Sequence, residues 1–213
     1  VLTSLASRFD RQFFKIALPF FLLGFSGMLQ SKTDLYCVAY FLNEKDVGQY
    51  QVFINLLIYV QVFASLILQP FLKNIYRLNS KITFKLSKKL FAAGVAITIP
   101  ALIFIYGILY WVYHFEFSMA FFIWGGLFIL PVYFYLPAVY SLYKLNCQSK
   151  VLIVNITGNS INLVLNILFI VYFGLLGAII ATAISQWVIL VGYLFYERKE
   201  AHSKAVGSRG GKQ

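Results

Sequence analysis

The sequence predicts an all-α membrane protein, a bundle of six transmembrane helices. Hydrophobic residues make up 61% of the 213 positions and charged residues 12%, whereas soluble domains are about half apolar and about a quarter charged. A small domain leaves much of its surface exposed, so a chain this apolar is expected to have lipid as its solvent. In addition, six segments are long enough to cross a bilayer, which takes about 20 mostly apolar residues.

The six segments follow one another with mostly short connections, so residues 1–200 form one transmembrane lobe. Their bounds are 13–42, 47–72, 90–113, 118–142, 151–173 and 175–196. The first is longer than a bilayer requires and should tilt, bend at Pro19 or project beyond the membrane. Residues 201–213 are polar and rich in glycine, which predicts a disordered cytoplasmic tail. Because the chain opens at Val1 rather than Met, we expect it to be part of a longer protein.

Basic residues fall almost entirely on one side of the predicted membrane. Of the 18 Lys and Arg, 16 lie on that side, while Lys45 lies on the other and Lys32 lies within the first segment. Basic residues stay in the cytoplasm during insertion, so both termini are assigned there. The stretch 73–89 is either a solvated loop or partly an interfacial helix that favours anionic lipid. The net charge of +11 thus reflects topology, and we expect no nucleic-acid partner.

A polar run interrupts the first segment and includes Gln30, Lys32 and Asp34. A charged group in lipid costs a few kcal/mol or more, so it usually has a partner or lines a wet cavity. Lys32 and Asp34 are two residues apart and do not share a helix face, so at least one should face a cavity or another helix. The run is either a site that handles substrate or ions, or it lies near the outer interface, where Lys32 snorkels to water.

Four asparagines mark one stripe of the fifth segment, because their spacings of 4, 3 and 4 residues keep them on one helix face. They are Asn155, Asn159, Asn162 and Asn166. Such a stripe must face protein or water. Either the amides bond neighbouring helices and fix the packing, or they form a polar wall of a translocation cavity, and the two are compatible. On the sixth segment Gly177, Ala181 and Ser185 form a ladder of small residues that lets another helix approach closely.

The residues do not predict an enzyme. No Ser/His/Asp set, paired membrane carboxylates or metal-ligand spacing can be assembled. Two cysteines and two histidines are also too few for a metal cluster or a disulfide framework. We therefore expect neither a metal nor a cofactor, and leave open a coupling to H⁺ or Na⁺.

Two stretches resemble a family. Residues 13–52 read FFKIALPFFLLGFSGMLQSKTDLYCVAYFLNEKDVGQYQV, in which a proline-containing helix with an intramembrane Asp precedes a Val-Gly-x-Tyr segment. Residues 155–186 read NITGNSINLVLNILFIVYFGLLGAIIATAISQ, an Asn-rich helix followed by Gly174 and by Gly177 and Ala178. Both resemble polysaccharide-biosynthesis flippases of the multidrug/oligosaccharidyl-lipid/polysaccharide exporter superfamily.

The resemblance implies one lobe, the C-terminal one, of a transporter of the multidrug-and-toxin-extrusion type. Such proteins have two six-helix lobes around a central cavity and work by alternating access. The oligosaccharide branch flips undecaprenyl-pyrophosphate-linked sugar units, such as O-antigen repeats, across the bacterial inner membrane. The implied partners are the bilayer, this lipid-linked oligosaccharide, and a missing N-terminal lobe or a second copy.

The resemblance also suggests roles for the polar residues. Lys32 would attract the anionic headgroup, Gln30 and the Asn stripe would bind sugar hydroxyls, and Asp34 would pair with a cation or titrate. A multidrug-extrusion exporter would instead require intramembrane carboxylates, and only Asp34 qualifies. A membrane enzyme of glycan assembly would be expected to carry a large outer loop with Arg or His, whereas the outer loops here are short. A non-transporting scaffold is also compatible with the helix pattern, although a buried Lys and Asp weigh against it.

Overall fold

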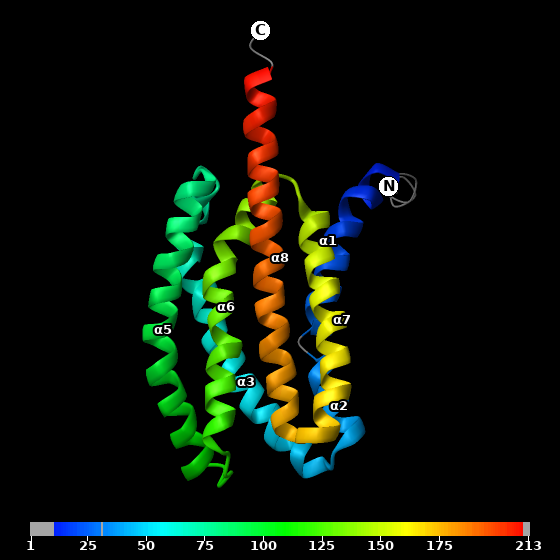
Figure 1. Ribbon diagram of the computed structural model, residues 1–213, viewed down its shortest axis with the longest axis vertical. Coiled ribbons are helices and arrows are strands. Elements are labelled where there is room, and N and C mark those ends of the chain that lie inside the picture. Colours follow the sequence, from blue (N-terminus) through cyan, green and yellow to red (C-terminus); the bar gives the residue numbers. More distant parts are fainter. Residues whose placement is uncertain (1–10, 31, 211–213) are drawn as a thin grey trace, which may run out of the picture.

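The computed structural model describes residues 11–30 and 32–210, and this part of the chain is helical apart from short connections (Figure 1). Its elements are α1 (Arg11–Gln30), α2 (Thr33–Phe41), α3 (Glu44–Leu68), the 3₁₀ turn η1 (Gln69–Phe71), α4 (Leu72–Ile75), α5 (Ser80–Trp111), α6 (Met119–Lys144), α7 (Gln148–Phe173) and α8 (Leu175–Gly210). Within the described residues, five stretches are long and apolar enough to cross a membrane: Glu44–Ile75, Ser80–Trp111, Met119–Lys144, Gln148–Phe173 and Leu175–Ala201. These correspond to the second to sixth predicted segments. The structure supports an all-α membrane protein.

The first predicted segment, 13–42, is divided between two helices. α1 continues through position 19 and ends at Gln30, and α2 begins at Thr33. The interruption therefore falls in the polar run and not at the proline. α2 has 9 residues and is too short to cross a bilayer alone. A sixth crossing made of α1 and α2 together remains a prediction.

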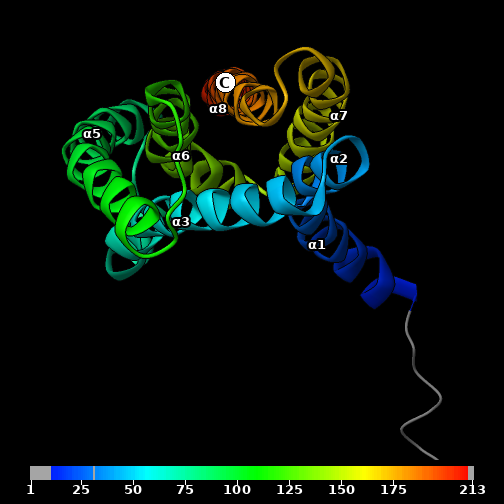
Figure 2. The ribbon, with the colours of Figure 1, turned by 90° about the horizontal axis from the view of Figure 1, so that it is seen from below.

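The helices are arranged around a core to which α3 and α6 contribute large buried side chains. Viewed along the bundle, α5, α6, α8 and α7 follow one another around an arc, α3 crosses one side of the arc, and α1 and α2 lie beside α7 (Figure 2). Tyr50, Phe53 and Leu57 of α3 are fully buried, as are Ile129 and Tyr133 of α6. The Tyr133 hydroxyl donates to the carbonyl oxygen of Val60 at 2.6 Å, which fixes α6 against α3.

Basic side chains gather at one end of the bundle. The N-terminal ends of α5 and α7 lie at the same end as the C-terminal ends of α6 and α8 (Figure 1). The basic residues of these ends include Lys81, Lys144, Lys150 and Arg198. We call this the basic end. The compartment that it faces remains a prediction.

The stretch 73–89, expected to be a solvated loop or partly an interfacial helix, is mostly helical. α4 ends at Ile75 and α5 already begins at Ser80. The Asn79 side chain caps α5 by accepting a hydrogen bond from the Ile82 amide at 2.9 Å. Thr83 and Ser87 are buried, while the lysines of these turns are exposed. The mixture of apolar and basic residues is therefore the amphipathic start of a long membrane helix.

α8 also extends further than the sequence predicts. The helix continues to Gly210, through most of the stretch 201–213 that is predicted to be disordered, and residues 211–213 lie outside the described part. Residues 197–201 read ERKEA, all good helix formers, so the helix has no local reason to end at the membrane surface.

Glycines allow α7 and α8 to pack closely. Gly174 ends α7 with a φ of 57°, a left-handed conformation that suits glycine, and α8 begins at the next residue. A Cβ on Gly177 would lie 2.1 Å from the Phe169 carbonyl oxygen. A Cβ on Gly158 would lie 2.3 Å from the Ile189 side chain. The small-residue ladder of α8 therefore lies in a helix contact.

Replacing Gly177 with Ala should destabilise the protein by about 1–3 kcal/mol, because the methyl group would overlap a backbone oxygen that cannot move independently. Gly48→Ala is the matched control, since a Cβ there meets nothing within 4 Å. Reversible unfolding in mixed micelles measures both. Equal stability of the two variants would contradict the close contact of α7 with α8.

Candidate functional site

Asp34 is the only acidic residue of the polar run, and it is buried in the bundle. The residue lies in the first turn of α2 and is 3% exposed. Its Oδ2 accepts a hydrogen bond from the Tyr50 hydroxyl of α3 at 2.6 Å, and its Oδ1 accepts one from the Leu35 amide at 2.8 Å. The Thr182 hydroxyl of α8 lies 3.5 Å from Oδ2. These three groups are all neutral, and two of them come from other helices.

A chain of hydrogen bonds continues from Thr182 into α7. The Asn162 amide nitrogen donates to the hydroxyls of Thr182 and Ser185, both at 3.2 Å. The Asn166 amide nitrogen donates to the Asn162 side-chain oxygen at 3.0 Å. The side chains of Asn162, Asn166, Thr182 and Ser185 are all buried. The bonds from Asn162 fix how α7 faces α8, while the Asn166 side-chain oxygen is buried with no hydrogen-bond partner among the described residues.

The Thr182 hydroxyl has two acceptors within reach. It lies 2.9 Å from the Ala178 carbonyl oxygen and 3.5 Å from the Asp34 carboxylate. A hydroxyl carries one proton and therefore donates to one acceptor at a time. Its proton can thus turn toward the carboxylate or toward the backbone of α8, according to the charge on Asp34.

A central cavity of about 200 Å³ adjoins this network. Its lining comes from six helices: Gly27 of α1, Asp34 of α2, Ile54, Ile58 and Gln61 of α3, Phe128 and Tyr135 of α6, Asn162 of α7, and Thr182, Ser185 and Gln186 of α8. The polar groups that line it offer carboxylate, hydroxyl and amide oxygens. Oxygen donors of this kind suit a proton, water or a small hard cation rather than a soft metal.

Three residues of the asparagine stripe bond to neighbouring helices. Asn155 accepts a hydrogen bond from the Tyr193 hydroxyl of α8, and its own amide lies 3.5 Å from the Ser26 hydroxyl of α1. Asn159 donates to the Ser26 carbonyl oxygen at 2.9 Å. Two residues of the stripe therefore tie α7 to α1, and Asn155 and Asn162 also tie it to α8. These bonds support the packing interpretation, and Asn162 also lines the central cavity.

Lys32 is not among the described residues that line the central cavity. Lys32 precedes α2 as its N-terminal cap residue and is partly exposed. Gln30 ends α1, and its side chain lies outside the part of the chain that the structure describes. Of the described side chains of the run, Asp34 lines the central cavity.

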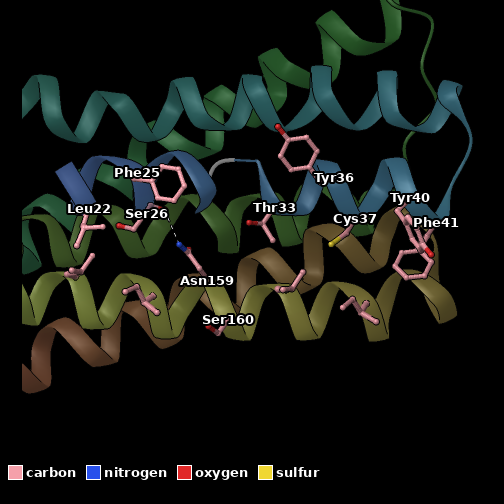
Figure 3. A pocket seen from close by; sticks show the side chains of 14 residues that line it. Leu22, Phe25, Ser26, Thr33, Tyr36, Cys37, Tyr40, Phe41, Asn159 and Ser160 are labelled. Atoms are coloured by element: carbon pink, nitrogen blue, oxygen red, sulfur yellow. Dashed lines mark hydrogen bonds between the residues drawn. The ribbon is translucent and has the colours of Figure 1, made fainter. Parts of the chain in front are cut away.

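A wide lateral groove opens between α7 and the pair α1 and α2 (Figure 3). It has a volume of about 810 Å³ and is walled mainly by apolar side chains, among them Leu22, Phe25 and Phe41. Asn159 reaches across it to Ser26, and the Asn159 side-chain oxygen is buried with no hydrogen-bond partner among the described residues. The groove is therefore mainly apolar, and an amide bridge crosses it.

Several residues of the site are not singled out by sequence reasoning. Gln61, Tyr135 and Gln186 line the central cavity, and the Tyr135 hydroxyl donates to the Gln186 side-chain oxygen at 3.3 Å. A usable signal lies in α8, where Thr182, Ser185 and Gln186 are spaced to share one face. The sequence alone favours a packing ladder for that side of the helix. Gln61 and Tyr135 are isolated polar residues, and their spacing carries no such signal.

Comparison of the chain with protein-family models, with curated proteins and with solved structures finds no match. The function must therefore be argued from the residues and their geometry.

Replacing Thr182 with Val should destabilise the protein by about 0.5–2 kcal/mol, because it leaves the buried Asn162 amide with one acceptor fewer. Thr157→Val is the matched control, since Thr157 is exposed on α7. Unfolding in mixed micelles measures both variants. A Thr182→Val protein as stable as the control would show that the network contributes nothing to the helix contact.

Proposed function

We propose that the chain is one lobe of an alternating-access flippase for a lipid-linked oligosaccharide, and that Asp34 couples the movement to H⁺ or Na⁺. In this proposal the substrate is an undecaprenyl-pyrophosphate-linked sugar unit for polysaccharide or O-antigen synthesis. The membrane is the bacterial inner membrane, with both termini in the cytoplasm. A second lobe, from a longer chain or a second copy, completes the substrate cavity.

One observation supports the proposal above the others. A carboxylate is buried at a helix interruption, beside a polar cavity to which six helices contribute. A buried carboxylate held only by neutral partners is costly, and such groups in membrane helices usually mark ion or proton paths. Interrupted helices are also where transporters form sites and move.

The central cavity is large enough for a coupling ion but too small for the transported substrate. About 200 Å³ holds a proton carrier, a few waters or a small cation, and is far too small for an oligosaccharide. The sugar unit therefore belongs between lobes. The Asn159 amide nitrogen is bound to Ser26, but its side-chain oxygen has no partner among the described residues, so we propose Asn159 and Gln30 as the candidates for sugar hydroxyls from this lobe.

Asp34→Asn, introduced into the full-length protein, should lower transport at least about ten-fold, because the amide cannot exchange a proton or carry the charge that holds a cation. The measurement is restoration of surface polysaccharide in cells that lack the protein. Asp46→Asn is the control, since Asp46 lies near the start of α3, away from the central cavity. Full activity of Asp34→Asn would overturn the coupling role.

Lys32→Ala in the same full-length protein should impair transport of the pyrophosphate-linked unit, because Lys32 is the cation that the sequence predicts within the membrane. Lys45→Ala at the opposite end from the basic residues is the control. Lys32→Arg should retain most of the activity, since it keeps the charge. Intact flipping in Lys32→Ala would remove this residue from substrate binding.

A second candidate function is favoured by the same cavity. A carboxylate with neutral oxygen donors also suits an ion-coupled multidrug-extrusion exporter, whose coupling chemistry would be the same. The two candidates differ in substrate. Loss of surface polysaccharide in cells without the protein supports the flippase, whereas normal polysaccharide with increased sensitivity to cationic drugs supports the exporter.

A further inference from the structure

Two cations from different helices share one aromatic ring at the basic end. The Lys88 ammonium of α5 lies 5.0 Å from the centre of the Phe84 ring, and the Arg198 guanidinium of α8 lies 5.5 Å from it. Cation–π contacts hold both groups against the ring. They also bring two like charges together at the rim of an apolar bundle, which is unfavourable without an anion between or beside them.

The local charge is not balanced by acidic neighbours. In residues 80–90 of α5 and 191–201 of α8 the charged side chains are Lys81, Lys85, Lys88, Lys89, Arg198 and Lys199 against Glu197 and Glu200. Glu197 is 4% exposed and turned into the bundle. Its Oε1 accepts hydrogen bonds from the hydroxyls of Ser80 at 2.7 Å and Ser141 at 3.4 Å. This carboxylate joins three helices rather than neutralising the exposed surface.

The cations stand at the end of an apolar surface. Arg198 and Lys199 line an open hollow of about 560 Å³ on the surface of α8, together with Val191, Leu194 and Phe195. The Phe84 ring that Arg198 contacts packs edge-on against Phe134 of α6, with ring centres 5.8 Å apart. Toward the middle of the bundle the surface is therefore apolar, and at its end it is cationic.

We propose that Lys88 of α5 and Arg198 of α8, which both contact the Phe84 ring, hold the phosphate of an anionic phospholipid. The acyl chains of this lipid lie along the apolar wall of α8. The arrangement matches the chemistry of that lipid, with charge at the rim and apolar surface below. A free phosphate or a nucleic acid would use the cations and leave the apolar wall unused. The lipid bridges α5 and α8 at the end where Glu197 already joins them. The proposal is independent of the transported substrate and of which compartment this end faces.

The test uses the purified full chain in nanodiscs that contain equal amounts of phosphatidylglycerol and phosphatidylcholine. After transfer to detergent, native mass spectrometry counts the lipids that remain bound. Lys88→Gln combined with Arg198→Gln should reduce retained phosphatidylglycerol roughly ten-fold or more, since each cation near the headgroup contributes about a factor of five. Phosphatidylcholine should be unaffected.

Lys85→Gln combined with Lys89→Gln is the matched control, because it removes the same charge from exposed positions of α5. The proposal expects this pair to retain phosphatidylglycerol within about two-fold of the unchanged protein. A charge-retaining pair, Lys88→Arg with Arg198→Lys, should also keep the lipid and guards against a general loss of folding. If both glutamine pairs lost the same amount of phosphatidylglycerol, the lipid would be held by diffuse surface charge, and the proposed site would be wrong. Displacement of the lipid by millimolar inorganic phosphate would likewise overturn the role of the apolar wall.

Discussion

The burial of the Asp34 carboxylate is the constraint on which the centre of this bundle depends. In an apolar interior a carboxylate is tolerated only when hydrogen bonds replace its lost water. Here the bonds come from Tyr50 on α3 and from the Leu35 amide at the start of α2, with Thr182 of α8 close by. The interruption between α1 and α2 supplies the free amide, because a helix start leaves its first N–H groups unpaired. Three helices must therefore meet at this point.

The remaining packing divides into apolar and polar contacts with different effects. Gly158 and Gly177 let α7 and α8 approach closely, which gives contact area but little directional preference. The bonds of Asn162 to Thr182 and Ser185 orient the two helices, because they form only when α7 and α8 turn these faces toward each other. The same polar groups border the central cavity. Stability and the candidate coupling site therefore draw on the same side chains, and a change in the charge of Asp34 acts directly on the contact between α2, α3 and α8.

Much of the fold could be predicted from the sequence, because hydropathy and the placement of basic residues report directly on the membrane. Five predicted segments agree with helices long enough to span it, within the described residues. The division of 13–42 could not be placed, since Pro19 is the visible breaker and the polar run gives no position for the interruption. Within the site, the burial of Asp34 could be predicted, because a carboxylate that faces lipid without a partner is energetically costly. Its partner Tyr50, 16 residues away, depends on how α3 folds back, which periodicity does not encode.

The most direct test is a double-mutant cycle between Asp34 and Tyr50. Unfolding free energies in mixed micelles are measured for the unchanged protein, Asp34→Asn, Tyr50→Phe and the double variant. A direct charge-assisted hydrogen bond in the bundle predicts a coupling energy of about 1–3 kcal/mol, so the second substitution should cost much less once the first is present. Additive effects, within about 0.5 kcal/mol, would show that the two side chains do not interact. The central network would then have to be abandoned.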